Sequence, residues 1–201
     1  YNAMVSQRGL MNLIHTAAQR DAFVRRGNAM ILNGADAEYL DEKQIQSSWY
    51  FRIDDRMGVE FGSNDYIFLN HSNQIIAMKN AGHEVAWHFH SYIKNDNSWV
   101  QNPDDEKVSE ELKRNWELAK KHELKALRMG WAYHSQRTYE TIDQYNLDYD
   151  SSALPRPNYS WENNLRNWEI TDQEPYYPSI EDYRKSSNLN YQTLQIPINT
   201  I

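Results

Sequence analysis

The stretch Gly82-His83-Glu84-Val85-Ala86-Trp87-His88-Phe89-His90-Ser91-Tyr92 contains three of the seven histidines of the chain. Its apolar residues predict a buried strand, in which successive side chains point to opposite faces. One face then carries Glu84, Ala86, His88 and His90, and the other carries His83, Val85, Trp87 and Phe89. Two imidazoles on one face, two residues apart, can bind a single metal ion with little backbone distortion. A lone buried histidine is usually a hydrogen-bonded core residue, but a His-x-His pair at the end of an apolar strand leaves both interpretations of His88 and His90 open.

Composition and charge exclude several classes of function. The 201 residues suffice for one domain with a sizeable core, and Tyr and Trp are frequent, with 14 and 7 residues. The net charge of −7 and the lack of a basic run argue against nucleic acid as a partner. No apolar stretch approaches the roughly 20 residues of a membrane span, and no secretory signal is recognisable, so we expect a cytoplasmic protein. The sequence does not indicate an oligomeric state.

The chain has no cysteine, which excludes disulfides and thiolate metal sites. Any bound metal ion must therefore be held by nitrogen and oxygen ligands.

Hydrophobic periodicity and turn residues predict alternating helices and strands. We expect helices at residues 7–26, 72–81, 106–122 and 136–145, the third and fourth beginning after polar loops. We expect strands at residues 47–53, 83–90, 124–129, 147–150 and 194–198. The segments 54–62 and 95–105 are expected to be loops. This alternation is typical of parallel β-α units in a single α/β domain spanning residues 4–201, with residues 1–3 as the remnant of an expression tag.

Several motifs, in the same order along the chain, resemble those of the NodB-type polysaccharide deacetylases, carbohydrate esterase family 4. The helix that begins near Ser72 leads into Gly82-His83-Glu84-Val85 and then to His88, as a Gly-His-Glu-hydrophobic segment leads into the metal motif of that family. Further resemblances lie at Ser48-Trp49-Tyr50-Phe51, Arg128-Met129-Gly130-Trp131, Leu147-Asp148-Tyr149-Asp150-Ser151-Ser152, Asn167-Trp168, Pro175-Tyr176-Tyr177-Pro178-Ser179 and Leu194-Gln195-Ile196-Pro197-Ile198. The resemblance covers roughly residues 5–201.

This resemblance implies a distorted (β/α) barrel, here possibly lacking its first strand, with the site at the carboxyl ends of the strands. Members of the family remove N- or O-acetyl groups from sugars. They hold a divalent metal ion, usually zinc, on one Asp and two His, and they use an Asp as base and a His as acid. The resemblance makes His88 the first metal ligand. The second is expected at position 92, which holds Tyr92, and His90 is the expected substitute.

The chain departs from the family pattern at other positions. No Asp-Asp motif precedes the helix expected at residues 7–26, and no Leu-x-His segment follows the last expected strand. The motif Pro is replaced by Gly130, and the motif Asp is replaced by Asn167. The visible catalytic set is therefore incomplete.

Other side chains are candidates for the same site. Asp54 and Asp55 end a strand expected beside the His-rich strand, so either could be a metal ligand or a base. They could equally be solvated or pair with Arg52 or Arg56. By resemblance, Arg128 orients the catalytic base, although a structural ion pair explains it equally well. The aromatic residues Tyr92, Trp131 and Trp168 are candidates for sugar binding, or for core packing.

The remaining histidines are expected to play minor roles. His83 is expected to be a packing residue, His134 a surface or cap residue, and His15 and His122 solvent-facing residues of helices.

The first functional hypothesis is a metal-dependent deacetylase that acts on an acetylated sugar in a bacterial polysaccharide pathway. Its expected cofactor is a divalent metal ion, most readily zinc, on His88 and His90. The alternative is a catalytically inactive carbohydrate-binding module on the same fold. A third hypothesis is an unrelated barrel hydrolase that uses Asp54 and Glu84 as a carboxylate pair.

Overall fold

The computed structural model describes residues 46–96, 98–155, 168 and 170–198. The chain divides into two compact units, which are described separately below. The first comprises residues 1–49 and 67–85, and the second comprises residues 50–66 and 86–201. The helix expected at residues 7–26 and the motif residue Asn167 lie outside the described residues.

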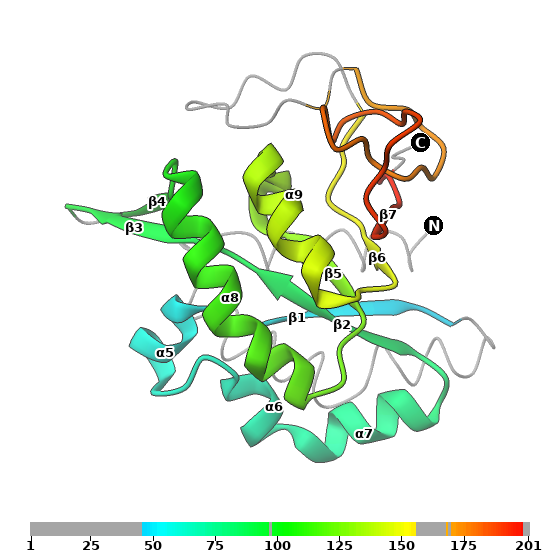
Figure 1. Cartoon of the computed structure of the whole chain (residues 1–201). Coiled ribbons are helices and arrows are strands. Elements are labelled where there is room, and N and C mark those ends of the chain that lie inside the picture. The colour runs from blue at the N-terminus through cyan, green and yellow to red at the C-terminus, as the bar shows by residue number, and fades with distance from the viewer. Residues whose placement is uncertain (1–45, 97, 156–167, 169, 199–201) are drawn as a thin grey trace. The chain divides into compact units, whose positions relative to one another are not determined.

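A mostly parallel sheet of five strands runs through the described chain (Figure 1). The strands follow the order β1, β2, β5, β6, β7, and β2 with β5, β5 with β6, and β6 with β7 pair in parallel. Their bounds are β1 Ser48–Arg52, β2 Glu84–Phe89, β5 Ala126–Met129, β6 Tyr149–Asp150 and β7 Leu194–Gln195. The α/β class and the parallel β-α organisation predicted from the sequence are confirmed.

Strand β2 is buried on both faces. Trp87 and Phe89 on one face have no exposed area, and neither has His88 on the other. Burial on both faces is the usual condition of strands inside a parallel sheet, and it explains the nearly continuous apolar run. The Trp87 indole N–H donates to the Ile53 carbonyl at 2.9 Å, so even this large side chain has its polar atom satisfied.

In the first unit, α7 (Ser72–Asn80) leads directly into the start of β2. Gly82 makes the connection with φ of 89°, a left-handed conformation that glycine adopts without strain. Ser72 is the first helical residue, as expected, and His71 precedes it without a side-chain cap bond. His83 is buried as expected, and its Nδ1 lies 3.0 Å from the Ser47 hydroxyl.

In the second unit, the segment after β1 forms the helix α5 (Asp55–Phe61), where the sequence predicted a loop. The helix forms because the Asp54 side chain accepts a hydrogen bond from the Met57 N–H at 3.1 Å, which caps its first turn. Gly62 ends it with φ of 86°. A short helix remains possible because both ends are capped.

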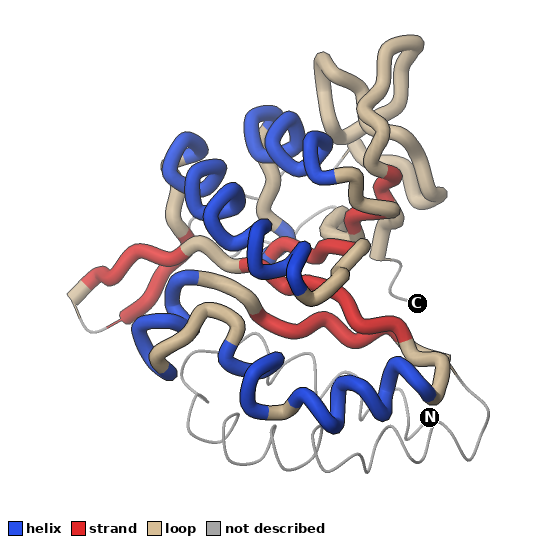
Figure 2. The backbone as a smooth tube through the Cα atoms, turned by 60° about the horizontal axis from the view of Figure 1, so that its bottom comes forward, coloured by secondary structure: helices blue, strands red, loops and turns tan. Residues whose placement is uncertain are grey.

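The segment 95–105, expected to be a loop, contributes to an antiparallel hairpin. Strand β3 (Tyr92–Asn95) pairs with β4 (Ser98–Gln101), and Tyr92 lies opposite Gln101. Most of the hairpin is solvent-exposed, so its sequence shows little apolar alternation. Figure 2 shows it extending away from the ends of the main strands of this unit.

Two helices lie side by side on one face of the strands in the second unit (Figures 1 and 2). They are α8 (Asp105–Lys121) and α9 (Gln136–Ile142), both predicted from the sequence. Helix α8 buries Val108, Leu112 and Ala119 along one side. Ser135 caps α9 with a reciprocal pair of hydrogen bonds to Thr138.

The short turns η3 (Gly130–Ala132) and η4 (Asp143–Tyr145) complete this unit, and α6 (Tyr66–Asn70) belongs to the first unit apart from its first residue. Among the described residues, none of the helices is long and apolar enough to cross a membrane.

The end of α8 is fixed by a polar contact that the sequence did not predict. His122, expected to face solvent, lies with its Nε2 2.8 Å from Asp65 Oδ2. Burial alone would raise the pKa of Asp65. The Ser63 hydroxyl, His122 and the Lys121 ammonium more than offset that effect and hold the pKa below its ordinary value.

This contact predicts a pH dependence of stability. Because the folded-state pKa of Asp65 lies below its unfolded value of about 3.9, its contribution is present above that pH and is lost as the pH falls through the folded-state pKa. Asp65→Asn should lower the free energy of unfolding at pH 7, and the difference from the wild type should shrink below about pH 4. Urea unfolding at pH 7 and pH 3 measures both quantities. The exposed Asp148→Asn is the control. A difference that stays constant with pH would contradict the prediction.

Candidate functional site

The two histidines at the carboxyl end of β2 lie against one another. The Nε2 atoms of His88 and His90 are 2.9 Å apart, and the two rings are nearly perpendicular, with centroids 4.6 Å apart. Both side chains are buried. Strand β2 ends at Phe89, but His90 still turns toward the side of His88. The structure therefore brings together the two residues that the sequence predicted as metal ligands.

The proton positions on this pair follow from its partners. His88 Nδ1 lies 2.9 Å from the Arg128 carbonyl, which can only accept, so we assign the proton of a neutral His88 to Nδ1. Its Nε2 then has a lone pair, and His90 Nε2 donates to it. The His88 lone pair therefore points at His90 Nε2.

The position of the His90 ring explains why residue 130 is a glycine. A Cβ placed on Gly130 would lie 2.0 Å from His90 Nδ1, far inside van der Waals contact. A proline, as in the family motif that this segment resembles, would carry that same Cβ. The loop after β5 therefore has its smallest residue where the imidazole needs the space.

The next two residues adopt a strained backbone. Trp131 and Ala132 both have φ of 54°, a left-handed conformation that costs a non-glycine residue on the order of 1–3 kcal/mol. The Trp168 indole N–H donates to the Ala132 carbonyl at 2.6 Å, and the Tyr133 N–H donates to the Gly130 carbonyl at 3.1 Å. These contacts hold the turn in place.

The strained turn sets the Trp131 ring edge-on to His90, with centroids 4.7 Å apart, and 4.9 Å from the Tyr92 ring. Trp168 is 2% exposed and supports the backbone of that turn. The two tryptophans proposed from the sequence thus occupy different places. Trp131 is half-exposed beside the histidines, and Trp168 lies behind it in the core.

Tyr92 occupies the position where the resemblance expects the second metal ligand. Its ring stacks on His90, with centroids 5.0 Å apart and planes 14° apart. Burial raises the pKa of Tyr92 above its ordinary value, and the nearby Arg52 only partly opposes this. The phenol therefore stays protonated at neutral pH.

The two acidic residues after β1 are held by cationic and polar partners. Asp54 has no exposed area, and its two oxygens accept hydrogen bonds from Arg52 at 2.7 and 2.8 Å. Asp55 accepts a hydrogen bond from Arg114 at 2.7 Å and from two asparagine side chains, Asn64 and Asn115. For Asp54 these contacts agree with the ion-pair interpretation of the sequence.

Arg128 contacts the segment that follows β6. Its Nε donates to the Ser151 carbonyl at 3.0 Å and its Nη2 to the Ser151 hydroxyl at 3.1 Å. The guanidinium also lies over the Tyr50 ring, 4.1 Å from the centroid. The Arg128 side chain thus connects β5 to the residue after β6 and to Tyr50 of β1, and its backbone carbonyl contacts His88 of β2.

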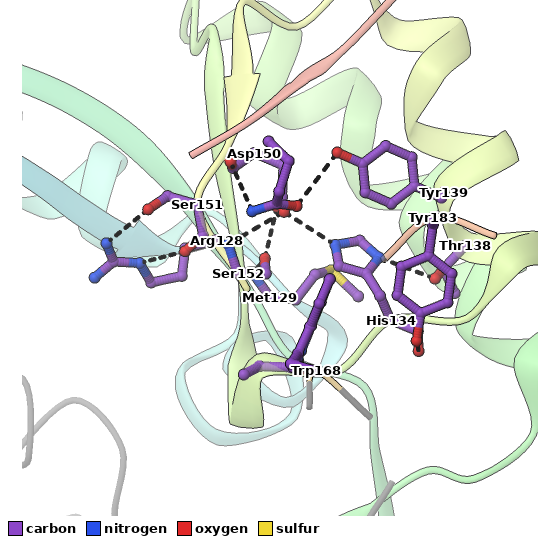
Figure 3. A network of polar contacts seen from close by, with 12 residues as sticks. Arg128, Met129, His134, Thr138, Tyr139, Asp150, Ser151, Ser152, Trp168 and Tyr183 are labelled. Atoms are coloured by element: carbon purple, nitrogen blue, oxygen red, sulfur yellow. Dashed lines mark hydrogen bonds and ion pairs between the residues drawn. The ribbon is translucent and has the colours of Figure 1, made fainter. Parts of the chain in front are cut away.

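A second polar network, which the sequence did not predict as a unit, centres on Asp150 (Figure 3). Asp150 Oδ1 accepts from the Ser152 hydroxyl at 2.6 Å, and Oδ2 lies 3.3 Å from His134 Nε2. The Met129 N–H donates to the Ser152 hydroxyl at 2.8 Å, which ties the ends of β5 and β6 together. All three side chains are buried, so the surface position expected for His134 is wrong, while its Nδ1 lies 3.1 Å from the Thr138 hydroxyl in the first turn of α9, beside the expected cap.

Among the described residues, no group of three or more His, Cys, Asp or Glu side chains is arranged to hold a metal ion. The His88–His90 pair therefore stands as two potential ligands without a third from those residues.

Comparisons with known proteins give limited similarities. No family model matches the chain. Over 40 residues the chain is 70% identical to sarcosine oxidase subunit beta of Rhizobium meliloti (strain 1021). These 40 residues make up 20% of this chain and 10% of that protein. A crystal structure titled "putative polysaccharide deacetylase from Mycobacterium smegmatis" aligns with a TM-score of 0.47 and 14% identity, over 80% of this chain and 43% of that chain. The match thus spans a tenth of the sarcosine oxidase subunit and less than half of the Mycobacterium smegmatis protein.

The crowding at Gly130 gives a test of the site geometry. Gly130→Ala should displace the His90 ring and lower the free energy of unfolding by about 1–3 kcal/mol, because its Cβ overlaps the imidazole. Histidine side-chain NMR signals and urea unfolding measure the two effects. Gly62→Ala is the matched control, since it meets nothing within 4 Å and costs about 1–2 kcal/mol through its backbone alone. Unchanged His88 and His90 signals in Gly130→Ala would refute the packing.

Proposed function

We propose that this protein is a metal-dependent hydrolase that removes an acetyl group from an acetylated sugar. The observation that carries the proposal is the buried His88–His90 pair, whose Nε2 atoms meet 2.9 Å apart at the end of a parallel strand. In α/β folds the carboxyl ends of parallel strands are the usual place for ligands and catalysis. The proposal also takes the five-stranded sheet as part of a distorted (β/α) barrel.

The pair fits a divalent metal ion in two respects. Zinc binds imidazole nitrogen at about 2.0–2.1 Å, so two ligands in a tetrahedral site lie roughly 3.3 Å apart, close to the spacing of the two Nε2 atoms. Ligand histidines usually donate their other N–H to a carbonyl or carboxylate, as His88 Nδ1 does to Arg128. We propose His88 and His90 as two of the ligands. A third would come from outside the described residues or from solvent.

When bound, a zinc ion would polarise the acyl carbonyl and lower the pKa of a bound water. The chain's own residues would position the substrate and hold the protons. Trp131 and Tyr92 would flank the sugar, because both rings are partly exposed beside His90. Asp54 is the carboxylate that we propose as base, and Arg52 fixes its orientation through two parallel hydrogen bonds.

A second candidate function is a carbohydrate-binding module without catalysis. Two observations favour it. The described residues contain no three-ligand group, and Arg52 donates a hydrogen bond to each of the two Asp54 oxygens. The aromatic side chains beside His90 would serve sugar binding in either case.

Metal analysis tests the first candidate. Protein purified with zinc should contain about one equivalent of metal, and His88→Ala and His90→Ala should each lose most of it, because catalytic zinc sites have only about three protein ligands. His122→Ala, at the end of α8, is the matched control and should keep its metal.

Hydrolysis of an acetylated chromogenic sugar, measured before and after treatment with a chelator, separates the two candidates. Activity that chelation abolishes and zinc restores supports the hydrolase. Equal metal content in all four proteins would remove the histidine pair from any metal site, and sugar binding without hydrolysis would favour the binding module.

A further inference from the structure

Arg56, in the first turn of α5, has a buried nitrogen without an acceptor. The side chain is 4% exposed, and its Nε donates to Glu60 Oε1 at 2.9 Å. Its Nη1 is buried and makes no hydrogen bond to the described part of the chain, although the Tyr92 phenol oxygen is a hydrogen-bond partner of the same guanidinium. Buried polar atoms in folded proteins are nearly always paired, and a guanidinium N–H is among the most costly to leave unpaired. This atom therefore calls for a partner.

Two aromatic rings enclose the Arg56 guanidinium. Its central carbon lies 4.7 Å from the centre of the Tyr92 ring and 5.2 Å from that of the Trp99 ring. Tyr92 and Trp99 come from the two strands of the β3–β4 hairpin, and their rings meet edge to face with centroids 6.1 Å apart. Both residues are partly exposed, so part of this aromatic surface is accessible beside a cation.

This arrangement is continuous with the histidine pair. The Tyr92 ring that lies against Arg56 also stacks on His90. The Trp131 ring meets the Tyr92 ring edge to face, with centroids 4.9 Å apart. A ligand that lies across Trp99 and Tyr92 would therefore reach the end of β2.

The charges around Arg56 are already balanced. Arg52 pairs with Asp54, and Arg56 pairs with Glu60, so the cluster has no excess positive charge. An anionic ligand would gain a hydrogen bond but little net attraction. The missing partner is best matched by an uncharged oxygen, such as a sugar hydroxyl or an amide carbonyl.

We infer that Arg56 and Trp99 form a sugar-binding subsite, in which Trp99 packs against a pyranose ring and Arg56 Nη1 donates to a neutral ring substituent. This inference rests on the proposed function for the identity of the ligand, and it adds residues that motif matching does not indicate. The hairpin then acts as the specificity element of the site.

A purely structural role for Arg56 makes a different prediction. Lysine at position 56 would keep the positive charge near Glu60 and above the two rings, but it lacks the planar fork that presents Nη1. Arg56→Lys therefore separates the support of the hairpin from the donation of a hydrogen bond. Arg114→Lys is the matched control, because Arg114 pairs with Asp55 at a partly exposed position.

The experiment measures binding of chitotetraose, the tetramer of N-acetylglucosamine, to the zinc-supplemented full chain by titration calorimetry. Arg56→Lys should bind about tenfold or more weakly, as expected for the loss of a hydrogen bond from a charged donor. Its melting temperature should match that of the wild type. Trp99→Ala should weaken binding to a similar extent, and Arg114→Lys should leave it unchanged.

Hydrolysis of the same sugar, followed in parallel as acetate release, keeps the two proposals distinct. Hydrolysis with an affinity that does not depend on Arg56 overturns the subsite and leaves the proposed function standing. Binding that depends on Arg56 without hydrolysis supports the subsite and refutes the hydrolase. A wild-type protein that does not bind the tetramer at all overturns the subsite.

Discussion

The burial of β2 on both of its faces is the constraint on which the described structure depends. A strand inside a parallel sheet has no solvent-facing side, so every polar side chain on it must find a partner within the protein. His88 has no exposed area, and it meets this requirement through the Arg128 carbonyl on one nitrogen and His90 on the other. The same requirement places His90 beside β5, and the space for its ring comes from Gly130. The histidine pair is therefore a consequence of the sheet as much as a candidate for chemistry.

The sequence predicted the parts of this arrangement that depend on local periodicity. The β2 strand, α8 and α9 have clear apolar repeats or caps, and the alternation of two residues correctly brought His88 and His90 together. Helix α5 was missed because it is only seven residues long and contains Gly58, although its capping residues were visible in the sequence. The hairpin was missed because its strands are exposed and polar, so no alternation marks them.

Contacts between distant segments explain the remaining differences. The sequence placed His134 at the surface or at a helix cap because nothing near it in the chain indicates burial, whereas the structure buries it and pairs it with Asp150, which lies on another element. The only sequence signal for this pairing was the alternating apolar and polar pattern that ends at Asp150, which places Asp150 at the end of a short strand. Trp131 and Trp168 look alike as motif residues, and only the folded turn shows that one faces the histidines and the other supports the backbone.

The turn that carries Trp131 shows how the site is held in shape. Two consecutive non-glycine residues, Trp131 and Ala132, adopt left-handed conformations, and such strain persists only where surrounding contacts fix it. The hydrogen bond from Trp168 and the packing of His90 on Gly130 provide such contacts. Because the ring of Trp131 is fixed before any ligand arrives, binding would not have to order it, and less free energy would be lost on association. The strain is therefore consistent with a preformed aromatic surface beside the histidine pair, which either a hydrolase or a sugar-binding module would use.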